Sequence, residues 1–350
     1  MDVQRYLANE PIVARPPSRI YRFQKMVARN RGLMAAAGAV FFALLLGLGL
    51  SCYLLIGQRE AVRRANTAEQ EQERLRNEAE KALALEKQLR QQAEVGDKLA
   101  SANRLLNDGH IDDAEQAVYA VAHPASAPLL NTLAQMRVRR GEWSHAITNY
   151  TRLTELTPGE PTPYYNLAAL LAYVDDGPSW QANSRRIIEQ FPADRAPSVL
   201  ERMAKACLIV PPRSPADLAA AVRLADIAVP GTANRKAPET FRLVRALAEY
   251  RRERFAAALR WLDGSAQEGE VARQAQAEAI RAMAQFRRGD RDTARATLAK
   301  AVGLAESLPT KGPTLSAQWP ERFVAASLVR EAKTLLEPSK MSKSDGAEKR

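Results

Sequence analysis

The sequence predicts an all-α protein with a single transmembrane helix, a long helical stalk and an α-superhelix of repeated helix pairs. Three observations carry this prediction. Residues 33–56 include no charged side chain. Residues 58–107 are rich in helix-forming residues and contain no proline. Between residues 97 and 337, small residues recur at fixed offsets around short breaks, which is typical of helical repeats.

Residues 1–32 form a basic juxtamembrane segment, and residues 33–56 form the predicted transmembrane helix. At about 1.5 Å per residue, the uncharged run is long enough to cross a bilayer core of about 30 Å. A secretory signal peptide has a shorter apolar core of about 7–15 residues close to the terminus. We therefore expect an anchor that is not cleaved.

Basic residues near the two ends of this helix set its expected orientation, because cytoplasmic flanks carry an excess of Lys and Arg. The head holds more of them than the other flank does. We expect a single-pass protein of the cell inner membrane, with the N-terminus in the cytoplasm and the repeats in the periplasm. The basic residues are Arg15, Arg19, Arg22, Lys25, Arg29 and Arg31 in the head, and Arg59, Arg63 and Arg64 after the span.

Residues 58–107 are expected to form a helical stalk or coiled coil. A heptad register places mostly small or apolar residues on one seam, but Gln72 and Glu86 interrupt it. A homodimer through the stalk therefore stays open. The seam residues are Ala68, Leu75, Ala79, Ala82, Leu89 and Ala93.

Residues 97–337 are expected to form the repeats. Gly141 lies seven residues after Ala134 and five before Ala146, and small residues at such offsets let two antiparallel helices approach closely. Gly177 has Ala182 at the later offset but Leu170 at the earlier one. The other sets with these offsets are Ala102, Gly109 and Ala114; Ala246, Glu253 and Ala258; and Ala282, Gly289 and Ala294.

The unit LLNTLAQMRVRRGEWSHAITNYTRLTELTP, residues 129–158, resembles the tetratricopeptide repeat. The head DVQRYLANEPIVARPPSRIYRFQKMVARNR, together with AKACLIV, ALAEYRRERFAAALRWL and AQAEAIRAMAQFRRGDRDTARATLAKA in the body, resembles bacterial serine/threonine protein kinases of the planctomycete and verrucomicrobial type. The resemblance implies the order kinase domain, juxtamembrane segment, membrane helix, stalk and repeats.

The sequence contains none of the motifs of the kinase domain, which are a glycine-rich loop, a strand lysine, an H-R-D-type loop and a D-F-G-type metal site. No catalytic residue is assigned, and we expect a membrane-anchored scaffold or sensor module of a kinase system that is not itself an enzyme. Two alternatives stay open. The sequence is a truncated record of a full transmembrane kinase, or the protein is an envelope assembly or secretion factor.

Six aromatic residues concentrate in the best repeat and in the one after it, where they predict either core packing or a groove for a peptide. Partners are expected to be proteins or peptides and the membrane, with a kinase in trans left open. The six candidates are Trp143, Tyr150, Tyr164, Tyr165, Tyr173 and Trp180.

Other polar clusters predict no chemistry. His110, His123 and His145 lack close metal-ligand spacing, so neither a metal nor another cofactor is expected. The pairs Asp112–Asp113 and Asp175–Asp176 lie beside turns, where aspartate caps helices. The net charge of +11 is spread along the helices, which argues against nucleic-acid binding. The polar tail, residues 338–350, is expected to be disordered.

Overall fold

A computed structural model of the chain has helices as its only regular elements within the residues it describes. The chain divides into two compact units, residues 1–90 and residues 91–350. The predicted disordered tail and most of the predicted head lie outside the described residues. The described residues are 4, 19–191, 195–231, 237–263, 270–313, 315–316 and 318–337.

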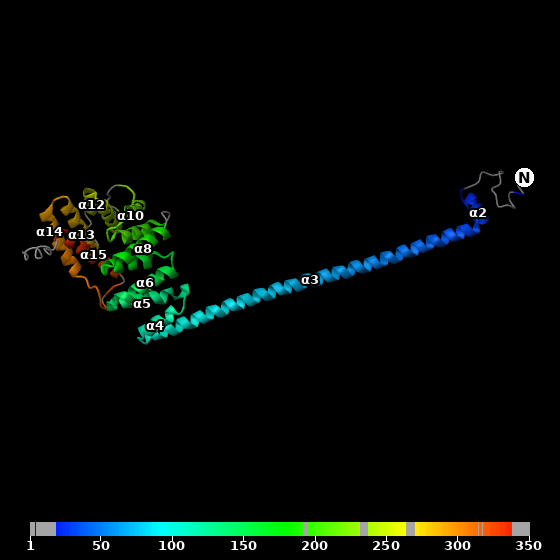
Figure 1. Cartoon of the computed structure of the whole chain (residues 1–350), viewed down its shortest axis with the longest axis horizontal. Coiled ribbons are helices and arrows are strands. Elements are labelled where there is room, and N and C mark those ends of the chain that lie inside the picture. Colours follow the sequence, from blue (N-terminus) through cyan, green and yellow to red (C-terminus); the bar gives the residue numbers. More distant parts are fainter. Residues whose placement is uncertain are drawn as a thin grey trace, which may run out of the picture. The chain divides into compact units, whose positions relative to one another are not determined.

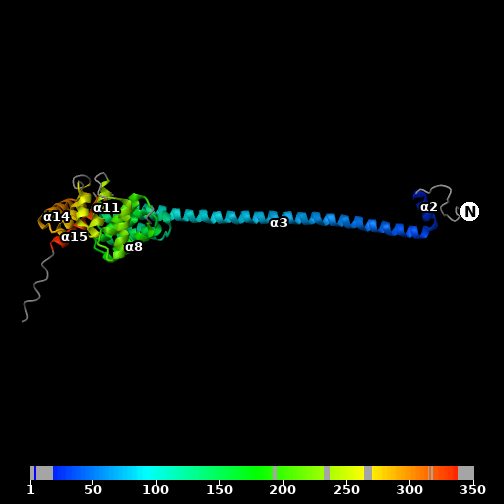
Figure 2. The ribbon, with the colours of Figure 1, turned by 90° about the horizontal axis from the view of Figure 1, so that it is seen from above.

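The first unit contains α2 (Arg19–Arg29) and most of α3 (Arg31–Asn107). Figures 1 and 2 show α3 as one uninterrupted helix, so the backbone has no break between the predicted membrane and stalk segments. Its apolar stretch is long enough and apolar enough to cross a membrane, by length and composition, and none of it is buried within the protein. The predicted domain limits at residues 56 and 58 are therefore changes of composition within one helix.

The stalk part of α3 is stabilised locally by ion pairs one turn apart. Glu60 pairs with Arg64 at 3.4 Å, and Arg74 pairs with Glu78 at 3.1 Å. Each such exposed pair contributes a few tenths of a kcal/mol, about 0.3–0.5. The larger seam residues Leu75 and Leu89 are each 56% exposed in the single chain, so no described part of the chain covers these two side chains.

The second unit is a stack of antiparallel helix pairs in which each helix contacts its neighbours in the sequence. Figure 1 shows the stack running from α4 and α5 (cyan to green) to α13 and α14 (orange). The helices are α4 (Ile111–Tyr119), α5 (Ala127–Arg140), α6 (Trp143–Leu156), α7 (Pro161–Tyr173), α8 (Gly177–Gln190), α9 (Pro197–Leu208), α10 (Pro215–Ala228), α11 (Glu239–Arg251), α12 (Phe255–Leu262), α13 (Val271–Arg287), α14 (Arg291–Glu306) and α15 (Trp319–Leu336), with a short 3₁₀ turn η1 (Pro124–Ser126).

Five of the helix pairs share one turn geometry. In the α5–α6 turn, Gly141 has a positive φ of 74°, its N–H donates to the Val138 carbonyl, and the N–H of Glu142 donates to the Arg137 carbonyl. This is the Schellman ending of a helix, which favours glycine at the left-handed position. The left-handed residues of the five turns are Gly109, Gly141, Asp175, Glu253 and Gly289.

Alanines seven residues before and five residues after these left-handed positions lie at the helix crossings. Each has 0% exposure, as close approach of two helix axes requires. The fully buried alanines at the predicted positions are Ala102, Ala114, Ala134, Ala146, Ala246, Ala258, Ala282 and Ala294.

The register expected for the α7–α8 unit is off by two residues. Ala182 is exposed and takes no part in the crossing, and the residue in the left-handed conformation is Asp175, not Gly177. The same offsets from Asp175 give Ala168 and Trp180, which are 0% and 3% exposed. Aspartate tolerates the left-handed region better than most residues, so the unit keeps its turn without a glycine there.

A buried ionic network joins the first helices of the second unit. Arg137 of α5, with a 4% exposed side chain, donates to Glu115 of α4 at 2.6 Å and to Asp112 and Glu142 at 2.5 Å each. These three acidic partners raise the pKa of Arg137 against the effect of burial, which acts to lower it and is the largest single cause. Glu115 also accepts from Asn149 of α6, so α4, α5 and α6 are held together by one network.

Candidate functional site

Four helices of the second unit pack side by side on its inner layer. These are α7, α9, α11 and α13, each in contact with the next, and the alternate helices α8, α10, α12 and α14 follow them in the chain. The last helix among the described residues, α15, packs against α7, α13 and α14, and both views in Figures 1 and 2 place it beside α14. We call the surface made by Tyr165, Tyr173, Lys205, Arg251 and Gln276 the inner groove, because side chains from all four inner helices meet α15 there.

The connection before α15 returns to the beginning of the stack. The N–H of Gly312 donates to the carbonyl of Arg139, at the end of α5, over 2.7 Å. The connection to α15 therefore passes the end of α5, although α15 also packs against α14, which precedes it in the sequence. This return path allows one helix to contact repeats that are far apart in the chain.

The first turns of α15 carry two aromatic rings into the inner groove. The Phe323 ring is fully buried and stacks on Tyr173 with centroids 4.2 Å apart, while Trp143 meets it edge-on at 5.4 Å. The Trp319 ring lies 5.8 Å from that of Tyr150. Such aromatic pairs add about 0.5–1.5 kcal/mol each beyond the area they bury.

The six predicted aromatic candidates therefore divide into two groups. Trp143, Tyr150, Tyr165 and Tyr173 contact α15. Tyr164 and Trp180 are only 2% and 3% exposed and lie within the helix pairs, with the Tyr164 ring packed edge-on against Phe191. The alternative of core packing describes Tyr164 and Trp180. The other four are covered by α15, the last helix that the structure describes.

Glu321 is the polar centre of the contact. Its carboxylate accepts from the Lys205 Nζ at 2.5 Å, from the Tyr165 hydroxyl at 2.5 Å and from the Gln276 Nε2 at 2.9 Å. Burial acts to raise the pKa of Glu321, but the charge of Lys205 and these hydrogen bonds together lower it to about 2. Burial, followed by the charge of Glu321, raises the pKa of Tyr165 well above 10, so the phenol stays a proton donor.

A second ionic contact holds the far half of α15. Glu331 accepts two hydrogen bonds from the Arg251 guanidinium, one of them at 2.7 Å. Arg251 also donates to the carbonyls of Leu208 and Ile209 at the end of α9, at 2.9 and 2.7 Å. The Arg251 side chain is 3% exposed, so this cation depends on the carboxylate that α15 supplies.

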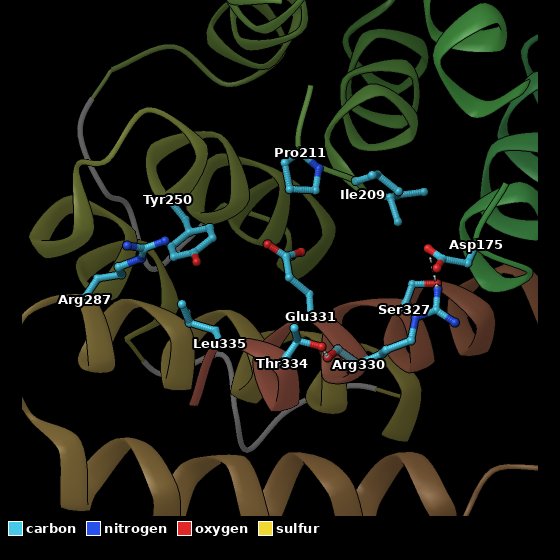
Figure 3. A pocket seen from close by; sticks show the side chains of 11 residues that line it. Asp175, Ile209, Pro211, Tyr250, Arg287, Ser327, Arg330, Glu331, Thr334 and Leu335 are labelled. Atoms are coloured by element: carbon cyan, nitrogen blue, oxygen red, sulfur yellow. Dashed lines mark hydrogen bonds and ion pairs between the residues drawn. The ribbon is translucent and has the colours of Figure 1, made fainter. Parts of the chain in front are cut away.

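α15 leaves open space along its sides. One pocket beside its later half has a volume of about 480 Å³. Figure 3 shows Glu331 of α15 facing Tyr250 of α11 and Pro211 there, with Arg287 of α13 at one end and the Asp175–Arg330 pair at the other. A second open pocket of about 300 Å³ lies at the beginning of α15, between Glu321 and Arg273. The inner groove is thus wider than the helix that occupies it.

The remaining polar candidates have structural roles. The His123 Nδ1 accepts from the Ala125 N–H at 3.1 Å, and the Asp176 carboxylate caps α8 by accepting from the Ser179 N–H at 3.1 Å. Among the described residues, no group of three or more His, Cys, Asp or Glu side chains is placed to hold a metal ion. Both cysteines are free thiols, Cys207 buried and Cys52 exposed on α3.

The groove residues Lys205 and Arg251, and the α15 residues Glu321, Phe323 and Glu331 that contact the groove helices, were not predicted from the sequence. Residues 319–336 read only as an amphipathic helix with aromatic residues four apart. Nothing local in that pattern says which surface the helix covers, because its partners lie more than 70 residues earlier in most cases.

Comparisons with known proteins give a general likeness to helical-repeat structures. No protein-family model matches the chain, and no curated protein sequence matches it. A tetratricopeptide repeat protein from Parabacteroides merdae aligns with 69% of this chain and 93% of its own, at 18% identity and a TM-score of 0.40. MamA from Desulfovibrio magneticus RS-1 aligns with 52% of this chain and 96% of its own, at 17% identity and a TM-score of 0.33. Yeast Tom70 aligns with 63% of this chain and 43% of its own, at 16% identity and a TM-score of 0.30. Because these TM-scores are low, the evidence for a tetratricopeptide-like fold is the set of helix pairs described above.

Proposed function

We propose that this chain is a membrane-anchored scaffold or sensor that binds a partner protein in the inner groove and performs no catalysis. The observation that carries the proposal is that the inner groove holds a helix through side chains from α7, α9, α11 and α13 together. A surface that recognises one helix by buried charges and stacked rings has the chemistry of a helix-binding groove.

The membrane anchor is supported by the apolar part of α3 and by α2. In α2, Ile20, Phe23 and Val27 fall on one side of the helix, and Arg22, Lys25 and Arg29 on another. Such a basic amphipathic helix beside an apolar span suits the interface of an anionic membrane. The proposed location is the inner membrane, with α2 on the cytoplasmic side and the repeats in the periplasm.

The proposed partner is a serine/threonine kinase of the same membrane, acting in trans. Support for this finer proposal comes from the resemblance of the head and body to the non-catalytic part of such kinases. An envelope assembly or secretion system is the second candidate partner, because a general helix-binding groove serves either class.

Site-specific photocrosslinking in cells tests the binding function. A photoreactive residue replaces Arg287, which is exposed beside the pocket of Figure 3, and in a matched control it replaces Ala296, which is exposed on α14. We expect one distinct protein to be crosslinked from position 287 and not from position 296, and mass spectrometry then identifies a kinase domain in it. Equal crosslinking from both positions contradicts a binding role for the inner groove.

Cysteine labelling tests the anchor and its orientation. In a C52A background, Q24C on α2 and Q91C on α3 place single exposed thiols on the two sides of the span, with Cys207 buried. We expect a membrane-impermeant maleimide to label Q91C in intact spheroplasts and Q24C only after lysis. The opposite order contradicts the proposed orientation, and labelling of both before lysis contradicts the anchor.

A further inference from the structure

α15 occupies the inner groove as a separate ligand would. The outer and inner helices from α5 to α14 contact one another in chain order, and this stacking does not pass through α15. α15 is joined to it by one connection, residues 307–318, and no described helix follows. The contacts that hold α15 are therefore those of an amphipathic helix laid across a completed stack.

The groove and its occupant are complementary in charge. The inner helices supply the cations, Lys205 and Arg251, whose side chains are each 3% exposed. α15 supplies the anions, Glu321 and Glu331. A buried cation that loses its carboxylate destabilises a protein strongly, so any other occupant of the groove has to bring carboxylates to the same two places.

The groove also sets the positions of the aromatic rings. Trp319 and Phe323, one helical turn apart, place their rings on Tyr150 and Tyr173, and Glu321 lies between them in the sequence. Arg330 adds a cation at the C-terminal end of α7, where it donates to the Tyr173 carbonyl at 2.9 Å. The open pockets beside the beginning and the later half of α15 leave room for side chains larger than those it carries.

We propose that the inner groove binds an amphipathic helix of a partner protein in the place of α15. That helix carries two aromatic residues four apart with a carboxylate between them, and a second carboxylate ten residues after the first. This inference rests on the proposed function of the repeats as a protein-binding module and names its ligand. α15 is then a built-in competitor, and the partner binds only as α15 leaves.

The test uses the full chain in detergent micelles and a fluorescent synthetic peptide of residues 318–337. In the wild type, α15 fills the groove, and we expect no saturable binding at micromolar peptide. F323A removes the ring stacked on Tyr173. In this variant we expect saturable peptide binding, with an affinity at least tenfold higher than the limit measured for the wild type. A peptide with lysine at both glutamate positions, 321 and 331, is expected not to bind.

F191A is the matched control, because Phe191 is as buried as Phe323 but packs in the α7–α8 pair. It is expected to destabilise the stack without admitting the peptide. Hydrogen exchange gives a second readout that needs no variant. In the wild type, amides of α15 are expected to exchange at least about tenfold faster than those of α9 and α11, because α15 opens separately.

Two results overturn the inference. One is exchange of α15 at the same rate as α9 and α11, which makes it a permanent part of the core. The other is an F323A variant in which α15 has left the groove but the peptide does not bind. That result includes the case in which α15 of one copy of the chain fills the groove of a second copy. The crosslinking experiment is independent of these outcomes. A partner crosslinked at position 287 with no peptide binding leaves the scaffold function standing and removes only the helical ligand.

Discussion

Replacing Glu321 with glutamine removes the charge at the centre of the inner groove and keeps the shape of the side chain. The Lys205 ammonium then stays buried without its carboxylate. The pKa of Glu321 falls from 4.5 to about 2 in the folded protein, and at 1.36 kcal/mol per pKa unit this difference corresponds to about 3 kcal/mol of stability at neutral pH. The Glu321 side chain is only 18% exposed, so solvent screening reduces this value little.

The pH dependence gives the prediction its sign. A carboxylate whose folded pKa is lowered contributes stability above its unfolded pKa and loses it as the pH falls towards the folded value. E321Q is therefore expected to be less stable than the wild type by about 3 kcal/mol at pH 7. The gap is expected to narrow below about pH 4.5 and to close near pH 2.

Urea unfolding of the full chain in micelles, followed by circular dichroism at pH 7 and pH 3, measures both values. A variant with both changes, K205M and E321Q, is expected to recover most of the loss, because neither partner is then left charged and buried. A loss below about 1 kcal/mol at pH 7 refutes the reasoning. A gap that stays constant down to pH 2.5 refutes it as well.

Three further predictions concern the stack and the buried thiol. Glu253 has a left-handed backbone with φ of 63°, so E253G is expected to be more stable by about 1 kcal/mol. G289A is expected to lose about as much, because φ there is 95° and the added Cβ meets no other atom, which leaves backbone strain as the cost. Thermal melts of both variants check the opposite signs. R137A leaves the buried Glu115 without its cation and is expected to lose about 3–5 kcal/mol in urea unfolding, whereas a loss near zero means that the network contributes nothing. Burial raises the pKa of the Cys207 thiol to about 12, so in C52A iodoacetamide at pH 8 is expected to alkylate Cys207 at least about a hundredfold faster in urea than in the folded chain.

The turn pattern was largely readable from the sequence because it depends on local geometry. Alanines seven before and five after a left-handed residue were recognised in four units, since glycine marks that conformation in three of them and the alanine spacing marks it at Glu253. The pattern failed at Asp175. There the left-handed residue is an aspartate. The offsets were counted from Gly177, two residues later, and therefore pointed to Ala182, which is exposed.

The sequence by itself also predicted helices over residues 33–56 and 58–107, from their composition and the absence of proline, and both ranges lie within α3. It did not indicate that the membrane and stalk segments form one helix, since a change of composition leaves the backbone unchanged. The six aromatic candidates come from two neighbouring repeats, but whether each faces a groove or the core depends on the orientation of whole helices.

Only the tertiary structure decided what covers the inner groove. Residues 319–336 have the pattern of an amphipathic helix in any protein. Their partners Tyr165, Lys205 and Arg251 are 156, 116 and 80 residues away in the sequence. No local pattern encodes such distances, because they are set by the summed packing of the helix pairs between them. Local preference thus fixed the helices and most turns, and long-range packing placed α15 on Lys205 and Arg251.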